Sequence, residues 1–150
     1  MDYSAIDPLD WTSVGAAFEE LGSIDLNDGN VEGWLLRWSA LSSVLYEAQA
    51  RIYRRLTENT KDEEADRQFA LLADEILPKA KAAEQGLRDK LLDMAGYRPA
   101  PENEVLFRRF KSAADLFRAD NVPIQSELMK LENQYDKIVG ALSIDWEGQP

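Results

Sequence analysis

Apolar residues recur every three or four positions along most of the chain, which is the pattern of amphipathic α-helices. The spacing, with breaks at Gly, Asn and Pro, predicts helices over residues 8–21, 30–58, 62–95, 102–118 and 123–139. Pro78 interrupts the third of these, because proline removes a backbone hydrogen bond and clashes with the preceding turn. We therefore expect a kink near Pro78, or two helices that meet at Leu77. The predicted fold class is all-α, with residues 1–150 forming one helical domain.

The two longest predicted helices carry the longest apolar stripes. The helix over 30–58 presents Val31, Trp34, Leu35, Trp38, Leu41, Leu45, Ala48, Ile52 and Leu56. The helix over 62–95 presents Ala65, Phe69, Leu72, Ile76, Ala80, Ala83, Leu87, Leu91 and Met94. Only a few polar residues separate the two helices, so an antiparallel hairpin lets each stripe face the other. The expected architecture is a helical bundle around this long antiparallel hairpin.

The shorter helices have recognisable ends and faces. Asp7 can cap the first helix and Pro8 suits its first position, while Gly22 ends it. The fourth helix is expected to turn inward the residues Leu106, Phe110, Ala113, Ala114 and Phe117. The face of the fifth helix, which Pro123 opens, consists of Ile124, Leu128, Leu131, Tyr135 and Ile138.

The period changes after Gly140. Leu142, Ile144 and Trp146 alternate with polar residues, which predicts a short C-terminal β-strand over about 141–146. A lone strand has no partner for its backbone N–H and C=O groups, so the strand needs a partner that the predicted helices do not supply. An extended tail is the alternative.

Composition narrows the possible partners. The net charge of −11 argues against nucleic acid. Residues 1–50 hold one base and nine acids, a net of 1 − 9 = −8, which leaves −3 for residues 51–150. This acid either attracts basic peptides or a basic partner surface, or only keeps the protein soluble. An acidic N-terminus and the lack of an apolar run of about 18 residues predict a cytoplasmic protein with no membrane partner.

The residue types in the chain exclude several kinds of catalytic and metal site. The chain has no His and no Cys, so it cannot form the usual structural zinc sites, a Ser-His-Asp triad or a His-Glu-x-x-His helix. The densest carboxylates, Asp62 to Glu64 with Asp66, begin a helix and point around it, which does not suit a metal. Trp34 and Trp38 lie on an apolar stripe, which indicates core. No catalytic residue and no metal ligand is predicted in this chain.

The chain also resembles a known family. The likeness begins in the Trp-containing helix from Val31 and continues through ADEILPKAKAAEQGLRDKLL. It is most specific in a series of short segments: Asp115 to Arg118, Asn121-Val122-Pro123, Tyr135 to Ile138, Gly140-Ala141 and Trp146-Glu147-Gly148. In this order the segments resemble the region that links the N-terminal helical lobe to the catalytic portion in oligoendopeptidase F, a family of zinc metallopeptidases related to thimet oligopeptidase.

The resemblance implies a scaffold that forms one wall of a peptide channel. The full-length family enzyme holds zinc and hydrolyses short peptides, but no position here matches its zinc ligands. The partners implied are the catalytic portion of the same polypeptide and, in the full-length enzyme, short peptides. Possible contacts to that portion or to a peptide are Phe117, Asn121, Tyr135, Asp136 and Trp146. The alternative is a free-standing helical interaction module without catalysis.

Overall fold

The computed structural model describes residue 3 and residues 5–144, and within these residues every regular element is a helix. The elements in chain order are α1 (Trp11–Ser23), α2 (Val31–Glu58), α3 (Glu63–Leu71), the π-helix η1 (Leu72–Ile76), α4 (Leu77–Leu92), the 3₁₀-helix η2 (Pro101–Asn103), α5 (Glu104–Leu116) and α6 (Asn121–Gly140). The predicted all-α class is confirmed. No helix in this part of the chain combines the length and apolar character that crossing a bilayer requires.

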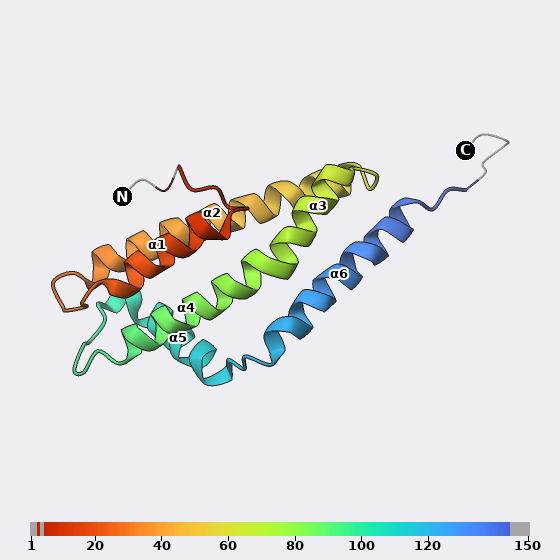
Figure 1. Cartoon of the computed structure of the whole chain (residues 1–150). Coiled ribbons are helices and arrows are strands. Elements are labelled where there is room, and N and C mark those ends of the chain that lie inside the picture. Colours follow the sequence, from red (N-terminus) through yellow and green to blue (C-terminus); the bar gives the residue numbers. More distant parts are fainter. Residues whose placement is uncertain (1–2, 4, 145–150) are drawn as a thin grey trace.

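The long hairpin at the centre of the fold is formed by α2 and by the rod that α3, η1 and α4 make together (Figure 1). The stripe of α2 is buried almost as predicted, at Val31, Trp34, Trp38, Leu41, Leu45, Ile52 and Leu56. The stripe of the opposing rod is buried at Ala65, Phe69, Leu72, Ile76, Ala80, Leu87 and Leu91. These two stripes supply most of the hydrophobic core.

Helix α1 packs against α4 and α2 and closes one side of the core. It begins at Trp11, later than predicted, because Asp10 is the residue that caps it, accepting a 2.9 Å hydrogen bond from the Thr12 N–H. The helix continues through Gly22 to Ser23. Trp34 is a core residue, as predicted, and its buried indole N–H donates a 2.9 Å bond to the Leu21 carbonyl.

The break that Pro78 imposes lies in the turn before it. In η1 the chain adopts π geometry, and the Leu77 N–H donates to the Leu72 carbonyl, five residues back. Helix α4 then begins at Leu77 with Pro78 in its first turn, where a missing N–H costs little. The prediction of two helices that meet at Leu77 is therefore close to the structure. It did not include the π turn. The rod ends at Leu92, earlier than the predicted residue 95.

Helix α5 lies against α4 and carries no fully buried residue. Its Phe110 stacks on Trp38, with ring centroids 4.9 Å apart, and Phe107 packs near Tyr97. Ala113, which we expected to face inward, is exposed. The helix ends at Leu116, before the predicted residue 118, because Phe117 takes an extended backbone conformation.

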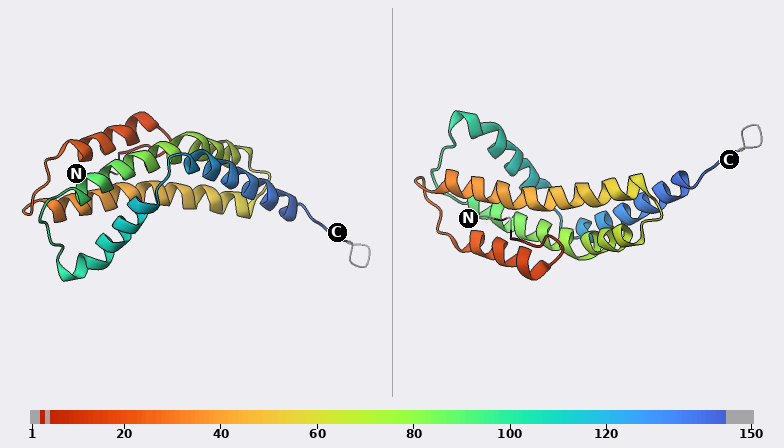
Figure 2. Two further views of the ribbon diagram at one scale, coloured as in Figure 1. Left: turned by 90° about the horizontal axis from the view of Figure 1, so that it is seen from below. Right: turned by 90° about the horizontal axis from the view of Figure 1, so that it is seen from above.

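The last helix, α6, runs from Asn121 to Gly140, so it begins two residues before Pro123. It lies along η1 and α4 (Figures 1 and 2). The predicted strand is not present over residues 141–144, which form a turn followed by residues without regular structure. The described residues contain no strand with which they could pair. Asp145 and Trp146, the remainder of that predicted strand, lie outside the described residues.

Candidate functional site

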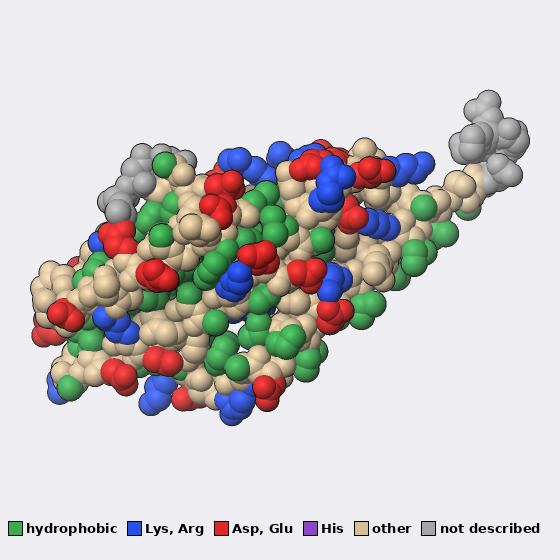
Figure 3. Space-filling model, viewed as in Figure 1, with side chains coloured by type: hydrophobic (Ala, Val, Ile, Leu, Met, Phe, Trp, Pro, Cys, Tyr) green, Lys and Arg blue, Asp and Glu red, His purple; other side chains and the backbone are tan. Residues whose placement is uncertain are grey.

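The outward side of α6 carries an apolar stripe that nothing in the described chain covers. The predicted face is solvent-exposed at every position: Ile124 64%, Leu128 53%, Leu131 59%, Tyr135 65% and Ile138 66%. Leu142, in the turn after the helix, extends it and is 74% exposed. We call these six residues the α6 stripe. In the space-filling view, hydrophobic side chains line the outer edge of the molecule along α6 (Figure 3).

The opposite side of α6 is polar and attaches the helix to the rod. Asp66 of α3 accepts hydrogen bonds from the Asn133 side chain at 3.0 Å and from the Lys137 ammonium at 2.5 Å. Asp74, which lies within η1, pairs with Lys130 at 2.9 Å. Ser126 is the buried residue of α6. The helix is thus held by these polar side chains together with Met129, which packs against the core. It turns most of its apolar side chains to water, the reverse of an ordinary surface helix.

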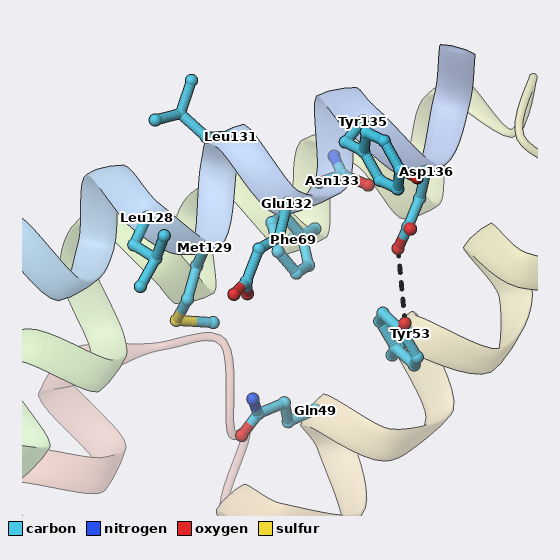
Figure 4. A pocket seen from close by; sticks show the side chains of 10 residues that line it. All are labelled: Gln49, Tyr53, Phe69, Leu128, Met129, Leu131, Glu132, Asn133, Tyr135 and Asp136. Atoms are coloured by element: carbon cyan, nitrogen blue, oxygen red, sulfur yellow. Dashed lines mark hydrogen bonds between the residues drawn. The ribbon is translucent and has the colours of Figure 1, made fainter. Parts of the chain in front are cut away.

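A groove of about 560 Å³ lies between α2 and α6 (Figure 4). Phe69, Leu128 and Met129 give it apolar walls, and Gln49 reaches toward it from α2. The Tyr53 hydroxyl donates a 3.3 Å hydrogen bond to the Asp136 carboxylate across the opening. The groove therefore continues the apolar α6 stripe on one side and ends in acidic groups.

The electrostatics of the two sides of α6 differ. The carboxylate of Asp136 and its hydrogen bond raise the pKa of Tyr53, with a smaller contribution from the charge of Glu132. On the inner side, the hydrogen bond from Lys137 lowers the pKa of Asp66. Among the described residues, Glu132 and Asp136 have no ion pair with a cation. The groove side of α6 therefore keeps negative charge that no cation among the described residues neutralises.

The structure brings together two of the five predicted contact residues. Tyr135 and Asp136 line the groove, and Asp136 bonds to Tyr53. Phe117 directly follows the end of α5, and Asn121 is the first residue of α6. About 14 helical residues, roughly 21 Å, separate Asn121 from Tyr135. Trp146 lies outside the described residues.

Sequence analysis missed the α2 side of the groove and one of its acids. Gln49 and Tyr53 lie one helical turn apart on α2, just off its buried stripe. Glu132 precedes Asp136 by four residues, so both carboxylates project from one side of α6. That spacing is visible in the sequence. The sequence does not show that this side of α6 faces α2, because this depends on how α6 packs.

One further polar cluster lies between α2 and α4. Burial raises the pKa of Glu84, which accepts a 3.3 Å hydrogen bond from Ser42 and pairs with Arg88 at 3.3 Å. Its partners are a hydroxyl and a cation, which suits a link between two helices more than acid–base catalysis with a second carboxylate. No group of metal-binding side chains is assembled anywhere in the described residues.

Comparison with known proteins finds no relative. The sequence matches no family model and no curated protein, and the fold matches no solved structure. The resemblance to the oligoendopeptidase F family therefore stays a prediction.

Proposed function

We propose that this chain is a non-catalytic helical lobe that holds a further folded unit against α6. The family resemblance suggests which unit: the zinc-binding catalytic portion of a cytoplasmic oligoendopeptidase F-like peptidase. In that assembly the lobe forms one wall of a channel for short peptides. The described residues offer no ligand set for zinc, so the proposal assigns zinc and peptide hydrolysis to the catalytic portion.

The observation that supports this role is the exposed α6 stripe. A continuous apolar face along a whole helix is unusual on a protein surface and marks an interaction site. The face lies opposite the polar contacts that fix α6 to Asp66 and Asp74. The helix is therefore held in place while its apolar side stays available to a partner.

The test is binding in trans. A purified zinc-binding catalytic portion of an oligoendopeptidase F enzyme is added to the chain, and thermal unfolding of the chain is recorded. Because a ligand that binds only the folded state stabilises it, a concentration a hundredfold above Kd should add about 2.7 kcal/mol to the unfolding free energy.

Two matched variants locate the contact. Leu131→Glu places a charge in the α6 stripe and should abolish the stabilisation. Leu36→Glu changes a leucine of α2 that is also exposed but lies outside the stripe, and this variant should retain the stabilisation. No stabilisation of the unaltered chain would contradict the peptidase-lobe proposal.

A second candidate is a free-standing interaction module, which the groove between α2 and α6 favours. A free-standing module should unfold in one cooperative transition that includes α6, because its helices need no further unit. A lobe should show lower hydrogen-exchange protection in α6 than in α2 until its partner is bound. Hydrogen exchange resolved by residue distinguishes the two.

A further inference from the structure

The α6 stripe has the spacing of a coiled-coil seam. From Ile124 to Leu142 its residues are separated by four, three, four, three and four positions. This is the alternation of the a and d positions of a heptad repeat, whose side chains insert between those of a second helix. Helix α6 has 20 residues and a length of about 30 Å, enough for two to three heptads. The exposed face therefore fits another helix better than a flat sheet or a loop.

The positions that flank the seam carry only negative charge. If the stripe supplies a and d, the flanking e and g positions are Gln125, Glu127, Glu132, Gln134, Val139 and Ala141. Both lysines of the inner side are held by the rod, Lys130 by Asp74 and Lys137 by Asp66. Glu127 shares Lys130 with Asp74, and Glu132 has no ion pair among the described residues.

This charge pattern disfavours a second copy of the chain as the occupant. In a parallel pair of α6 helices, the g residue Glu127 would face the e residue Glu132 of the other copy on both sides. In an antiparallel pair, e residues face each other, which brings the two Glu132 carboxylates together. The net charge of −11 adds long-range repulsion between copies.

We propose that the α6 stripe binds an amphipathic helix with aliphatic residues along its own seam and Lys or Arg at its flanks. Such a helix would bury the stripe and place its cations beside Glu127 and Glu132. On the groove side, Asp136 lies one turn beyond Glu132 and offers a second carboxylate. The inference rests on the proposed function, since the helix would belong to the unit that the lobe holds.

The test uses synthetic helices about three heptads long. One peptide has Leu at a and d and Lys at e and g, and a second is identical except for Glu at e and g. A third has the composition of the first in scrambled order, which measures attraction between a basic peptide and an acidic protein without a seam. Affinities for the full chain are measured by fluorescence anisotropy at low and at physiological salt.

The Lys-flanked helix should bind about tenfold more tightly than the Glu-flanked helix, and the difference should shrink at higher salt. Glu132→Lys should remove most of that preference. Glu19→Lys, which makes the same charge change at an exposed site on α1, should leave it intact. Leu131→Glu should weaken both helical peptides.

Three results would overturn the inference. The first is equal affinity for the Lys-flanked and the Glu-flanked helix. The second is an affinity for the scrambled peptide equal to that for the Lys-flanked helix. The third is dimerisation of the chain alone that Leu131→Glu abolishes. The last would identify a second copy as the occupant. Binding of the catalytic portion without any selection between the peptides would defeat this inference and leave the proposed function standing. If instead the chain prefers the Lys-flanked peptide but does not bind the catalytic portion, the peptidase assignment is wrong and the preference for a basic helix stands.

Discussion

Helices α2 and α6 have similar patterns and opposite environments. Each carries an apolar stripe at helical spacing along its whole length. The α2 stripe is buried between α1 and the rod, with Leu41 fully inaccessible to solvent, whereas Leu131 of the α6 stripe is 59% exposed. Periodicity thus predicts which residues share a face, but not whether the same chain supplies a cover for that face.

The inner side of α6 explains the difference. It offers Asn133, Lys130 and Lys137, whose polar groups find carboxylates on the rod. These partners fix which side of α6 faces inward, and the apolar side is left opposite. α2 also makes polar contacts, such as that of Ser42 with Glu84, but its apolar stripe is the side that faces inward. Burial of apolar surface therefore decides its orientation.

The largest expected effect is on the free energy of unfolding, when one leucine of α2 and one leucine of α6 are each replaced by alanine. Leu41→Ala should lower the free energy of unfolding by about 2–5 kcal/mol, because it removes buried contacts and leaves a cavity. Leu131→Ala should change it by no more than about 0.5 kcal/mol, because the side chain is already in water. Urea denaturation of both variants measures the two values. A loss above 2 kcal/mol for Leu131→Ala would mean that the stripe is covered in solution.

An intermediate effect concerns the attachment of α6. Because Lys137 lowers the pKa of Asp66 from its ordinary value of 3.8, the folded state holds that proton less tightly than the unfolded state does. The stabilisation is therefore fully present above about pH 4 and is lost as the pH falls through the lower folded-state pKa. At a solvent-screened site it should amount to no more than about 1 kcal/mol.

Hydrogen exchange of α6 amides checks this prediction. Asp66→Asn should reduce protection of α6 at neutral pH and abolish the loss that acidification causes. Asp115→Asn changes an exposed acid of α5 and serves as the control. Equal acid sensitivity in the Asp66→Asn chain would show that other groups attach α6.

The smallest effect concerns the groove between the two helices. The negative charge of Asp136 disfavours the tyrosinate form, so Asp136→Asn should lower the pKa of Tyr53 toward its ordinary value of 10.0. Stability should change by less than about 0.5 kcal/mol, because Tyr53 is 50% exposed and Asp136 is only partly buried. Absorbance titration of tyrosinate, with Tyr53→Phe to identify the signal, measures the change. An unchanged titration would mean that α2 and α6 are further apart in solution.

The buried stripes and the hairpin could be predicted from sequence because they depend on spacing and short connections. The capping of α1 by Asp10 and the π turn before Pro78 could not be predicted. Asp7 and Asp10 are both competent caps, and only the packing of α1 selects between them. A proline predicts a break, but whether the break becomes a kink or a π turn depends on the contacts of the rod.

The candidate site was predictable only in part. Tyr135 and Asp136 were expected to make contacts, and the structure places them in the groove. Tyr53 belongs to a helix more than 80 residues away, so no local pattern links it to Asp136. The predicted strand failed over residues 141–144 because an alternating segment needs a second strand to form hydrogen bonds.

The π turn also sets the helical phase between the rod and α6. Lys130 and Lys137 are seven residues apart, almost two full turns of an α-helix, so they point the same way. Their partners Asp74 and Asp66 are eight residues apart, and in an unbroken α-helix they would be about 80° out of phase. The wider turn at η1, which contains Asp74, offsets part of this difference. The chain thus accommodates Pro78 while both Asp66 and Asp74 remain within reach of α6.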